Sequence, residues 1–221
     1  MRRSVLMLLL TVLMAASALA QDDSFAELVI TAAGDEEFDI ATGITTLHDG
    51  GTISHRERGI ELTSSFIRYL GDEYVETGEA EAEGPFGTVQ AGSVYFDLPE
   101  DSLHAADGVT YESGNLFVTA TELLLYAGDG VVELRGEVES AEPAFRAARL
   151  LFDTDSGTVL LFGPYSYDDG LLELSADGED SLLELTGTDS DGEDAADDGT
   201  DFTASSSPAE ETLTRFGPWL D

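Results

Sequence analysis

Apolar and polar residues alternate along most of this chain. Between about residues 28 and 186, short runs rich in Val, Thr, Leu, Tyr and Phe are separated by turn-forming stretches such as "GDG" and "DSG". Alternation with a period of two is typical of strands that bury one face, and Gly, Asp and Ser clusters mark the turns between them. The pattern predicts an all-β fold.

The alternating runs form a repeat. The segments "LTSSFIRY", "VQAGSVYF", "VTATELLL" and "FRAARLLF" match one another when a small residue is used as the reference, and a weaker fifth copy surrounds Ala176. The reference residues, about 28 positions apart, are Ser64, Ala91, Ala120 and Ala147. The second half of each unit has a central glycine, at Gly78, Gly108, Gly136 and Gly163. Each unit is therefore predicted to contain two short strands.

One copy of the repeat has the composition of a helix. Residues 144–153, "AFRAARLLFD", are mostly good helix formers. The equivalent segments "VQAGSVYF" and "LTSSFIRY" are poor helices, so we expect a strand at 144–153 as well, with a helix as the alternative.

The spacing within each copy predicts a bend. Apolar or small residues lie two positions apart, as at Val89 and Ala91, then three apart to Val94, and then two apart again at Phe96. Side chains alternate between faces along a strand, so a three-residue step keeps them on one face only where the strand bulges or bends. Stacked bends predict a folded, V-shaped sheet with one long inner face, with Ser64, Ala91, Ala120 and Ala147 at its crease.

The repeat also predicts which side chains share the inner face of this sheet. They are Leu62, Ile67, Tyr69, Val89, Val94, Phe96, Val118, Leu123, Leu125, Val132, Leu134, Phe145, Leu150, Phe152, Val159 and Leu161. Two interpretations remain open. These residues form either a closed core or the lining of an apolar cleft that serves as a ligand or partner site.

This pattern resembles the OstA-like family, which includes periplasmic lipopolysaccharide-export proteins of the Lpt A and Lpt C type. The features in common are the small residue at the crease, the aliphatic residues that follow it, the "VYFD" and "LLFD" endings, the glycine-centred second strand and the opening "IATGITTLHDGG". The resemblance covers residues 28–185. It implies a twisted, open, jelly-roll-like trough that binds the acyl chains of an envelope glycolipid. The lipid is then transferred between the inner and outer membranes during outer-membrane assembly.

The same resemblance implies partners. Members of the family associate end to end through edge strands, with each other or with other proteins of the export machinery. The apolar segment "AELVITA" near the N-terminus is a suitable pairing edge, because unpaired strands recruit another chain unless they are charged or covered. The chain departs from the family's ligand chemistry in one respect. It is very acidic, which indicates either cation bridging to lipid phosphates or a less charged lipid.

The two ends of the chain have compositions of their own. Residues 1–20 combine Arg2 and Arg3 with a short apolar run and small residues up to Ala20, which predicts a signal peptide that is cleaved after Ala20 and a periplasmic location. Residues 21–186 are assigned to the β domain. Residues 187–221 are predicted to be an acidic, disordered tail, in which Phe216 and Trp219 either dock onto the domain or fray.

Charge excludes some classes of function. The chain has a formal net charge of −37, with nine Arg and no Lys, so nucleic acid is not an expected partner. An acidic surface is also typical of proteins that stay soluble in a salty medium. The chain has no Cys, so its stability depends on burial and strand pairing alone.

No motif in the sequence points to catalysis. The chain has no G-x-S-x-G elbow, and its histidines are His48, His55 and His104. The "HDGG" turn is expected to form a hairpin with His48 opposite Thr52, too far from His55 for a shared metal. The Asp-rich segments do not fit a calcium loop. We therefore expect no enzymatic activity, no metal site and no cofactor.

Two functions follow from the sequence. The first is binding and transport of an envelope glycolipid by an OstA-like β domain. The alternative is a structural or adhesive β-repeat protein of the cell envelope, with a closed core.

Overall fold

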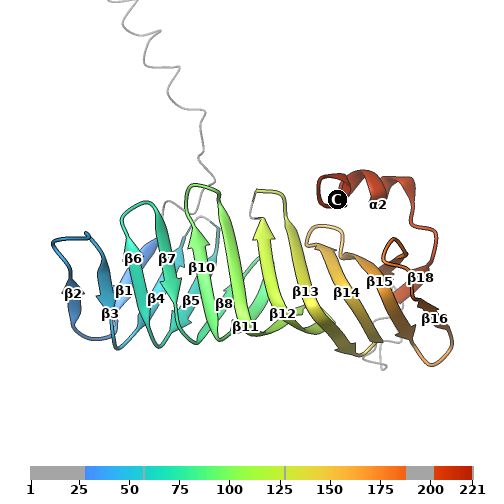
Figure 1. The fold of residues 1–221 in the computed structure, drawn as a ribbon, viewed down its shortest axis with the longest axis horizontal. Coiled ribbons are helices and arrows are strands. Elements are labelled where there is room, and N and C mark those ends of the chain that lie inside the picture. The colour runs from blue at the N-terminus through green and yellow to red at the C-terminus, as the bar shows by residue number, and fades with distance from the viewer. Residues whose placement is uncertain (1–27, 57, 127, 188–201, 221) are drawn as a thin grey trace, which may run out of the picture.

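The computed structural model describes residues 28–56, 58–126, 128–187 and 202–220. It confirms the predicted all-β class. Eighteen antiparallel strands form one open sheet that does not close on itself, and the strands stack along the long axis of the molecule (Figure 1). Within the described residues, one short helix and one 3₁₀ turn complete the secondary structure.

The sheet is folded into two facing walls, which we call wall A and wall B. At the N-terminal end the strands are short, and each lies in one wall. Wall A contains β1 (Val29–Ala32), β4 (Gly51–His55), β5 (Ile60–Ser64), β8 (Ala80–Gly84) and β9 (Gly87–Ala91). Wall B contains β2 (Glu36–Phe38), β3 (Thr45–Leu47), β6 (Ile67–Leu70), β7 (Tyr74–Thr77) and β10 (Ser93–Asp97).

In the C-terminal half, long strands run through both walls. These are β11 (Ser102–Ser113), β12 (Leu116–Tyr126), β13 (Val131–Ala141), β14 (Ala144–Asp153) and β15 (Thr158–Asp168). The register shifts at one place in each pairing, between Ala106 and Val109 of β11 for example, and there the strands bend from one wall into the other. Wall A ends at β16 (Glu173–Ala176), and wall B ends at β17 (Leu182–Gly187) and β18 (Phe202–Ser205).

The bends follow the repeat. The segment at 144–153 is the strand β14, not a helix, because its backbone pairs on both sides with β13 and β15. Its register shift lies between Ala147 and Arg149, at the predicted three-residue step. The glycine of the second strand also marks a bend, as at Gly108 in β11 and Gly136 in β13. Both strands of a repeat therefore turn at the crease.

One expected hairpin is wrong. The "HDGG" segment does not pair β3 with β4: Leu47 pairs with Glu36 and Ile67 in wall B, whereas Thr52 pairs with Thr31 and Thr63 in wall A. The segment instead carries the chain from one wall to the other.

The expectation of a disordered tail at 187–221 is wrong for residues 202–220. They form the strand β18, which pairs with β17 in wall B, followed by the helix α2 (Glu210–Arg215) and the 3₁₀ turn η2 (Gly217–Trp219). The helix and the 3₁₀ turn lie against the outside of wall B (Figure 1). Residues 188–201 lie outside the described residues, as does the predicted signal peptide at 1–20. Gly187 is the last residue of β17.

Candidate functional site

The apolar interior between the walls, which we call the trough, contains all the predicted inner-face residues. Wall A supplies Leu62, Val89, Val118 and Phe145. Wall B supplies Ile67, Tyr69, Val94, Phe96, Leu123, Leu125, Val132, Leu134, Leu150, Phe152, Val159 and Leu161. All but Tyr69 belong to a single buried cluster, and none of these is more than 5% exposed. Tyr69 is partly buried and packs against the same cluster.

The trough is filled by its own side chains. Inward-facing residues of the second strands complete it, among them Leu103 and Tyr111 of β11 and Leu183 and Leu185 of β17. The repeat did not predict these four as inner-face residues, although the alternation around Leu103 and Tyr111 is a signal that indicates them. An acyl chain can therefore enter only where wall–wall contacts give way.

Small residues lie where the walls meet. Ser64, Ala91, Ala120 and Ala147 are all buried, and each stands at a strand end or a register shift. The Ser64 hydroxyl donates to the carbonyl of Phe66 at 2.8 Å and accepts from the Phe66 N–H at 3.2 Å. The strand ladder is interrupted between β5 and β6, which leaves backbone groups there without a ladder partner. The Ser64 hydroxyl supplies partners for the N–H and the carbonyl of Phe66.

Two hydroxyl groups inside the trough are paired with backbone carbonyls of the chain itself. The Tyr111 hydroxyl donates to the carbonyl of Phe86 at 2.6 Å, and burial raises the pKa of this phenol above its ordinary value. The Thr77 hydroxyl donates to the carbonyl of Val94 at 3.1 Å. These bonds let an otherwise apolar interior contain hydroxyl groups at low cost.

Opposite the crease, each wall ends in a row of turns, which we call its rim. The rim of wall A includes Arg58 and Gly59 between β4 and β5 and the turn at 84–87. The rim of wall B includes the turns at 70–74 and 98–101. Arg58 of wall A donates to Asp101 of wall B, with Nη2 and Oδ2 3.0 Å apart. Phe86 and Leu98, one from each rim, are buried. The rims are therefore in contact, and the trough is closed.

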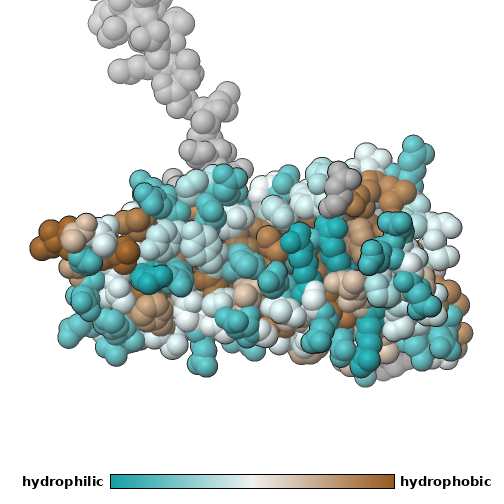
Figure 2. Space-filling view, in the orientation of Figure 1, coloured by the Kyte–Doolittle hydropathy of each residue, from teal (hydrophilic) through white to brown (hydrophobic). Residues whose placement is uncertain are grey.

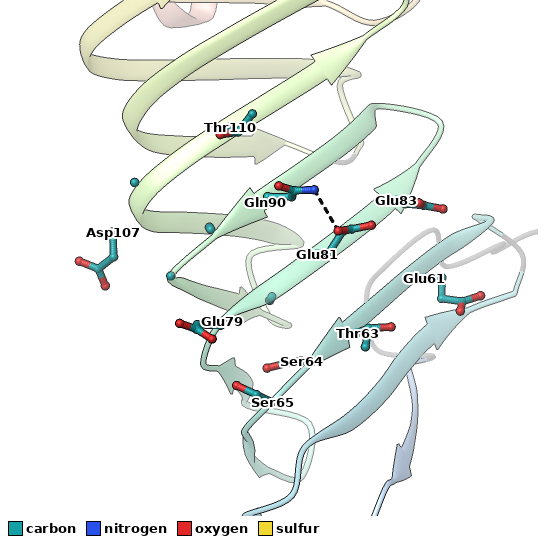
Figure 3. Close-up of a pocket in the computed structure, with 14 residues that line it drawn as sticks. Glu61, Thr63, Ser64, Ser65, Glu79, Glu81, Glu83, Gln90, Asp107 and Thr110 are labelled. Carbon is teal, nitrogen blue, oxygen red and sulfur yellow. Dashed lines mark hydrogen bonds between the residues drawn. The ribbon is translucent and has the colours of Figure 1, made fainter.

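The outside of wall A has a polar hollow. This groove, of about 810 Å³, lies over β5, β8 and β9, and Figure 3 shows its side chains on the outer surface of these strands. Its lining includes Glu61, Glu81, Glu83 and Asp107 but no Arg, and Gln90 donates to Glu81 at 2.9 Å. The groove reaches the crease at Ser64 and Ala91, and its acidic lining is unsuited to acyl chains.

The C-terminal segment, residues 206–220, covers part of the outside of wall B. Phe216 is fully buried in a second apolar cluster with Val131, Leu151, Leu160 and Phe162, which project outward from wall B. The outer face of β13 to β15 in this wall therefore carries apolar side chains beside the charged Glu133, Arg149 and Asp153, and the C-terminal segment covers it.

Charged side chains fix this segment in place. Arg149 lies over the Phe162 ring, 4.6 Å from its centroid, and donates to the buried Glu133 and to the carbonyl of Trp219. Glu184 accepts from the N–H of Ala209 at 2.7 Å and from the Thr212 hydroxyl. A buried carboxylate is tolerated only when it is paired, and both Glu133 and Glu184 have partners.

The ion pair between Arg215 and Asp153 completes the attachment. The guanidinium donates to both carboxylate oxygens, at 3.0 and 3.1 Å. Burial opposes ionisation of Asp153, but hydrogen bonds from Arg215, the N–H of Asp155 and Ser156 outweigh it and lower the pKa of Asp153.

The three histidines lie apart. His48 contacts Glu37, with Nε2 and Oε2 2.8 Å apart, His55 is buried in wall A, and His104 lies on the outer side of wall B with Nε2 4.0 Å from Glu122. Among the described residues, no group of three or more His, Asp or Glu side chains is placed to hold a metal ion.

Comparisons with known proteins add no relative. No family model matches this chain, and a search of curated proteins finds no match either. No helix in the described part of the chain is long and apolar enough to cross a membrane.

Proposed function

We propose that this protein binds the acyl chains of an envelope glycolipid in the trough and transfers the lipid between the inner and outer membranes. The observation that carries the proposal is the continuity of the trough. A single apolar cluster extends from Leu47 and Ile53 near one end of the sheet to Leu183 and Leu185 near the other. Acyl chains are long and apolar, and a continuous apolar layer between two surfaces matches their shape and solubility.

The geometry of the walls supports binding without loss of the fold. The walls are covalently continuous along the crease, and along the rims they meet only through side chains and turns. Parting the rims leaves the ladders within each wall intact. Lipid then replaces wall–wall contacts with equivalent apolar contacts, so the exchange costs little hydrophobic free energy.

The ends of the sheet support association with partners. At the N-terminal end, β1 and β2 are edge strands, and Val29, Phe38 and Ile40 are exposed; Figure 2 shows hydrophobic side chains at the β2 end. At the other end, Leu171 and Leu172 are exposed beside β16. Unpaired edges with apolar neighbours suit pairing with a second copy or with another protein of the same fold. We propose such end-to-end pairing in the periplasm.

The alternative function is a structural or adhesive role in the cell envelope. The specific observation that favours it is the closure of the trough, since the interior is already packed by the chain's own side chains. In that case the edges mediate assembly, and the trough contributes only stability.

Native mass spectrometry of the protein purified from its own envelope distinguishes the two functions. Transport predicts a co-purifying lipid that survives detergent-free purification and is released on unfolding. A lipid-free spectrum, together with no uptake of cis-parinaric acid, a fluorescent fatty acid, would support the structural role. The Leu123→Glu variant is the matched control, because a carboxylate in the trough should abolish lipid retention.

A further inference from the structure

Arg58 and Asp101 connect the two walls at the side where they are not joined by backbone. Arg58 lies in the turn between β4 and β5, and Asp101 lies in the turn between β10 and β11. The two side chains are 14% and 27% exposed, so water screens the pair less than it screens a surface ion pair. Among the described residues, no other ion pair joins the two rims.

The backbone positions Asp101 for this contact. Asp101 has a φ of +50°, a left-handed conformation that is uncommon for residues other than glycine. Its N–H donates to the carbonyl of Leu98 at 3.4 Å, which closes the turn. A strained residue is retained only where its surroundings hold it, and here the carboxylate is turned toward the opposite rim.

The part of the sheet next to this pair is built to hinge. In the N-terminal half, the strands stop at the crease, and links of one to three residues join the walls, at residues 33–35, 48–50, 65–66, 78–79 and 92. In the C-terminal half, β11 to β15 continue through the crease. Short links bend more easily than continuous paired strands, so the walls part more readily in the N-terminal half.

We propose that the Arg58–Asp101 pair is the clasp of the trough, and that acyl chains pass between the walls in the N-terminal half when this pair breaks. The proposal rests on the proposed lipid-binding function and identifies the step that controls access to the same trough. The clasp holds the two rims together. Its removal should widen the rims even when no lipid is present.

The absence of Cys allows this to be measured with two introduced spin labels. Asp72→Cys places a label on the exposed rim of wall B, and Pro85→Cys places one on the exposed rim of wall A. Pulsed electron–electron double resonance then gives the distribution of distances between the two labels, and therefore between the rims. In the background of Arg58→Gln or Asp101→Asn, we expect a second population, longer by about 5 Å, half the usual spacing of packed sheets.

The size of the effect can be bounded. Loss of one charge-assisted hydrogen bond predicts a roughly tenfold larger open fraction. Arg58→Lys keeps the charge and should restore most of the closed population. The matched control is Arg68→Gln, which removes an Arg from an ion pair with Glu76 that lies within wall B and should leave the distance unchanged. An unchanged distance in both Arg58→Gln and Asp101→Asn would overturn the clasp.

A second measurement separates the clasp from the proposed function. Because the clasp controls access to the trough, we expect Arg58→Gln to take up cis-parinaric acid about tenfold faster than the parent protein does. We expect Arg68→Gln to take it up at the parent rate. Wider rims without any uptake would support the clasp and overturn lipid binding. Uptake by the parent protein at the same rate as Arg58→Gln, with unchanged rim distances, would support lipid binding and overturn the clasp.

Discussion

The ring of Tyr111 in wall A meets the ring of Phe152 in wall B edge-on, with centroids 5.9 Å apart and planes inclined at 63°. The two residues belong to different repeats, and the contact spans the trough. Aromatic pairs in this arrangement contribute beyond their buried area. The free energy lost when this contact is truncated therefore reports how strongly the two inner faces pack together.

Truncation of this contact should be costly. Phe152→Ala removes a ring that is 5% exposed, and we expect a loss of about 3 to 5 kcal/mol in the free energy of unfolding, measured by urea denaturation. Tyr111→Phe keeps the ring but leaves the carbonyl of Phe86 without its donor, so we expect a smaller loss, about 1 to 2 kcal/mol. Equal losses for the two variants would contradict this order.

The crease should not accept a large side chain. Ala120 faces the inside of the bend in β12 and is 8% exposed, whereas its neighbour Thr119 faces outward and is exposed. Ala120→Trp should lower the thermal midpoint by 10 °C or more or prevent folding, since overpacking at a bend displaces backbone; about 4 °C is expected per kcal/mol. Thr119→Trp is the control and should leave the midpoint nearly unchanged. Similar midpoints for both variants would show that the crease has room.

Gly136 tests the bend of the second strand of a repeat. Its φ is +69°, and an added Cβ would lie 2.8 Å from Oγ1 of Thr121, which donates to the Gly136 carbonyl. Gly157 has a φ of +68° but open space around it. Gly157→Ala should cost about 1 kcal/mol from conformation alone, and Gly136→Ala about 2 to 3 kcal/mol. Equal chemical-denaturation midpoints would show that the Thr121 contact relaxes freely.

Acid should release the C-terminal segment. The pKa of Asp153 is lowered in the folded protein, so the Arg215 pair stabilises docking above the ordinary carboxyl pKa of about 4 and loses this effect as the pH falls through the lowered value. Trp219, the single Trp of the chain, lies in the docked segment beside Tyr126. Its emission should therefore shift to longer wavelength below about pH 4.

The control for this titration is Asp153→Asn. The variant cannot form the ion pair with Arg215 at any pH, so its C-terminal segment should dock more weakly at neutral pH. Its acid transition should lack the contribution of Asp153. An identical transition in the parent protein and in Asp153→Asn would show that other carboxylates control release.

The repeat could be predicted from the sequence because equivalent segments adopt the same structure. Strand pairing with the neighbouring copies outweighs the helix propensity of any single copy. Residues 144–153 form β14 despite their helical composition, and the three-residue step at Ala147 coincides with the bend. The bends at Gly108 and Gly136 were missed because a glycine interrupts alternation without indicating which way the strand turns. The trough residues were predicted from periodicity, but periodicity does not report how closely two walls pack.

The C-terminal segment was missed for a different reason. Its composition is polar, and its order depends on partners that are distant in the sequence, such as Arg149 and Glu184. The sequences of the wall B strands did indicate that their outer face is covered. The runs "VV" at 131–132, "LLF" at 150–152 and "LLF" at 160–162 are apolar on consecutive positions, which indicates strands covered on both faces.

The most direct test of the lipid-binding account is photo-crosslinking in the native envelope. A photoreactive residue is placed at Leu123 or Phe152, which face the trough, and at Tyr95, which is 38% exposed on the outside of wall B. The account predicts lipid adducts at Leu123 and Phe152 and none at Tyr95, detected by mass spectrometry. Adducts confined to this chain or to other proteins at both inward positions would contradict it.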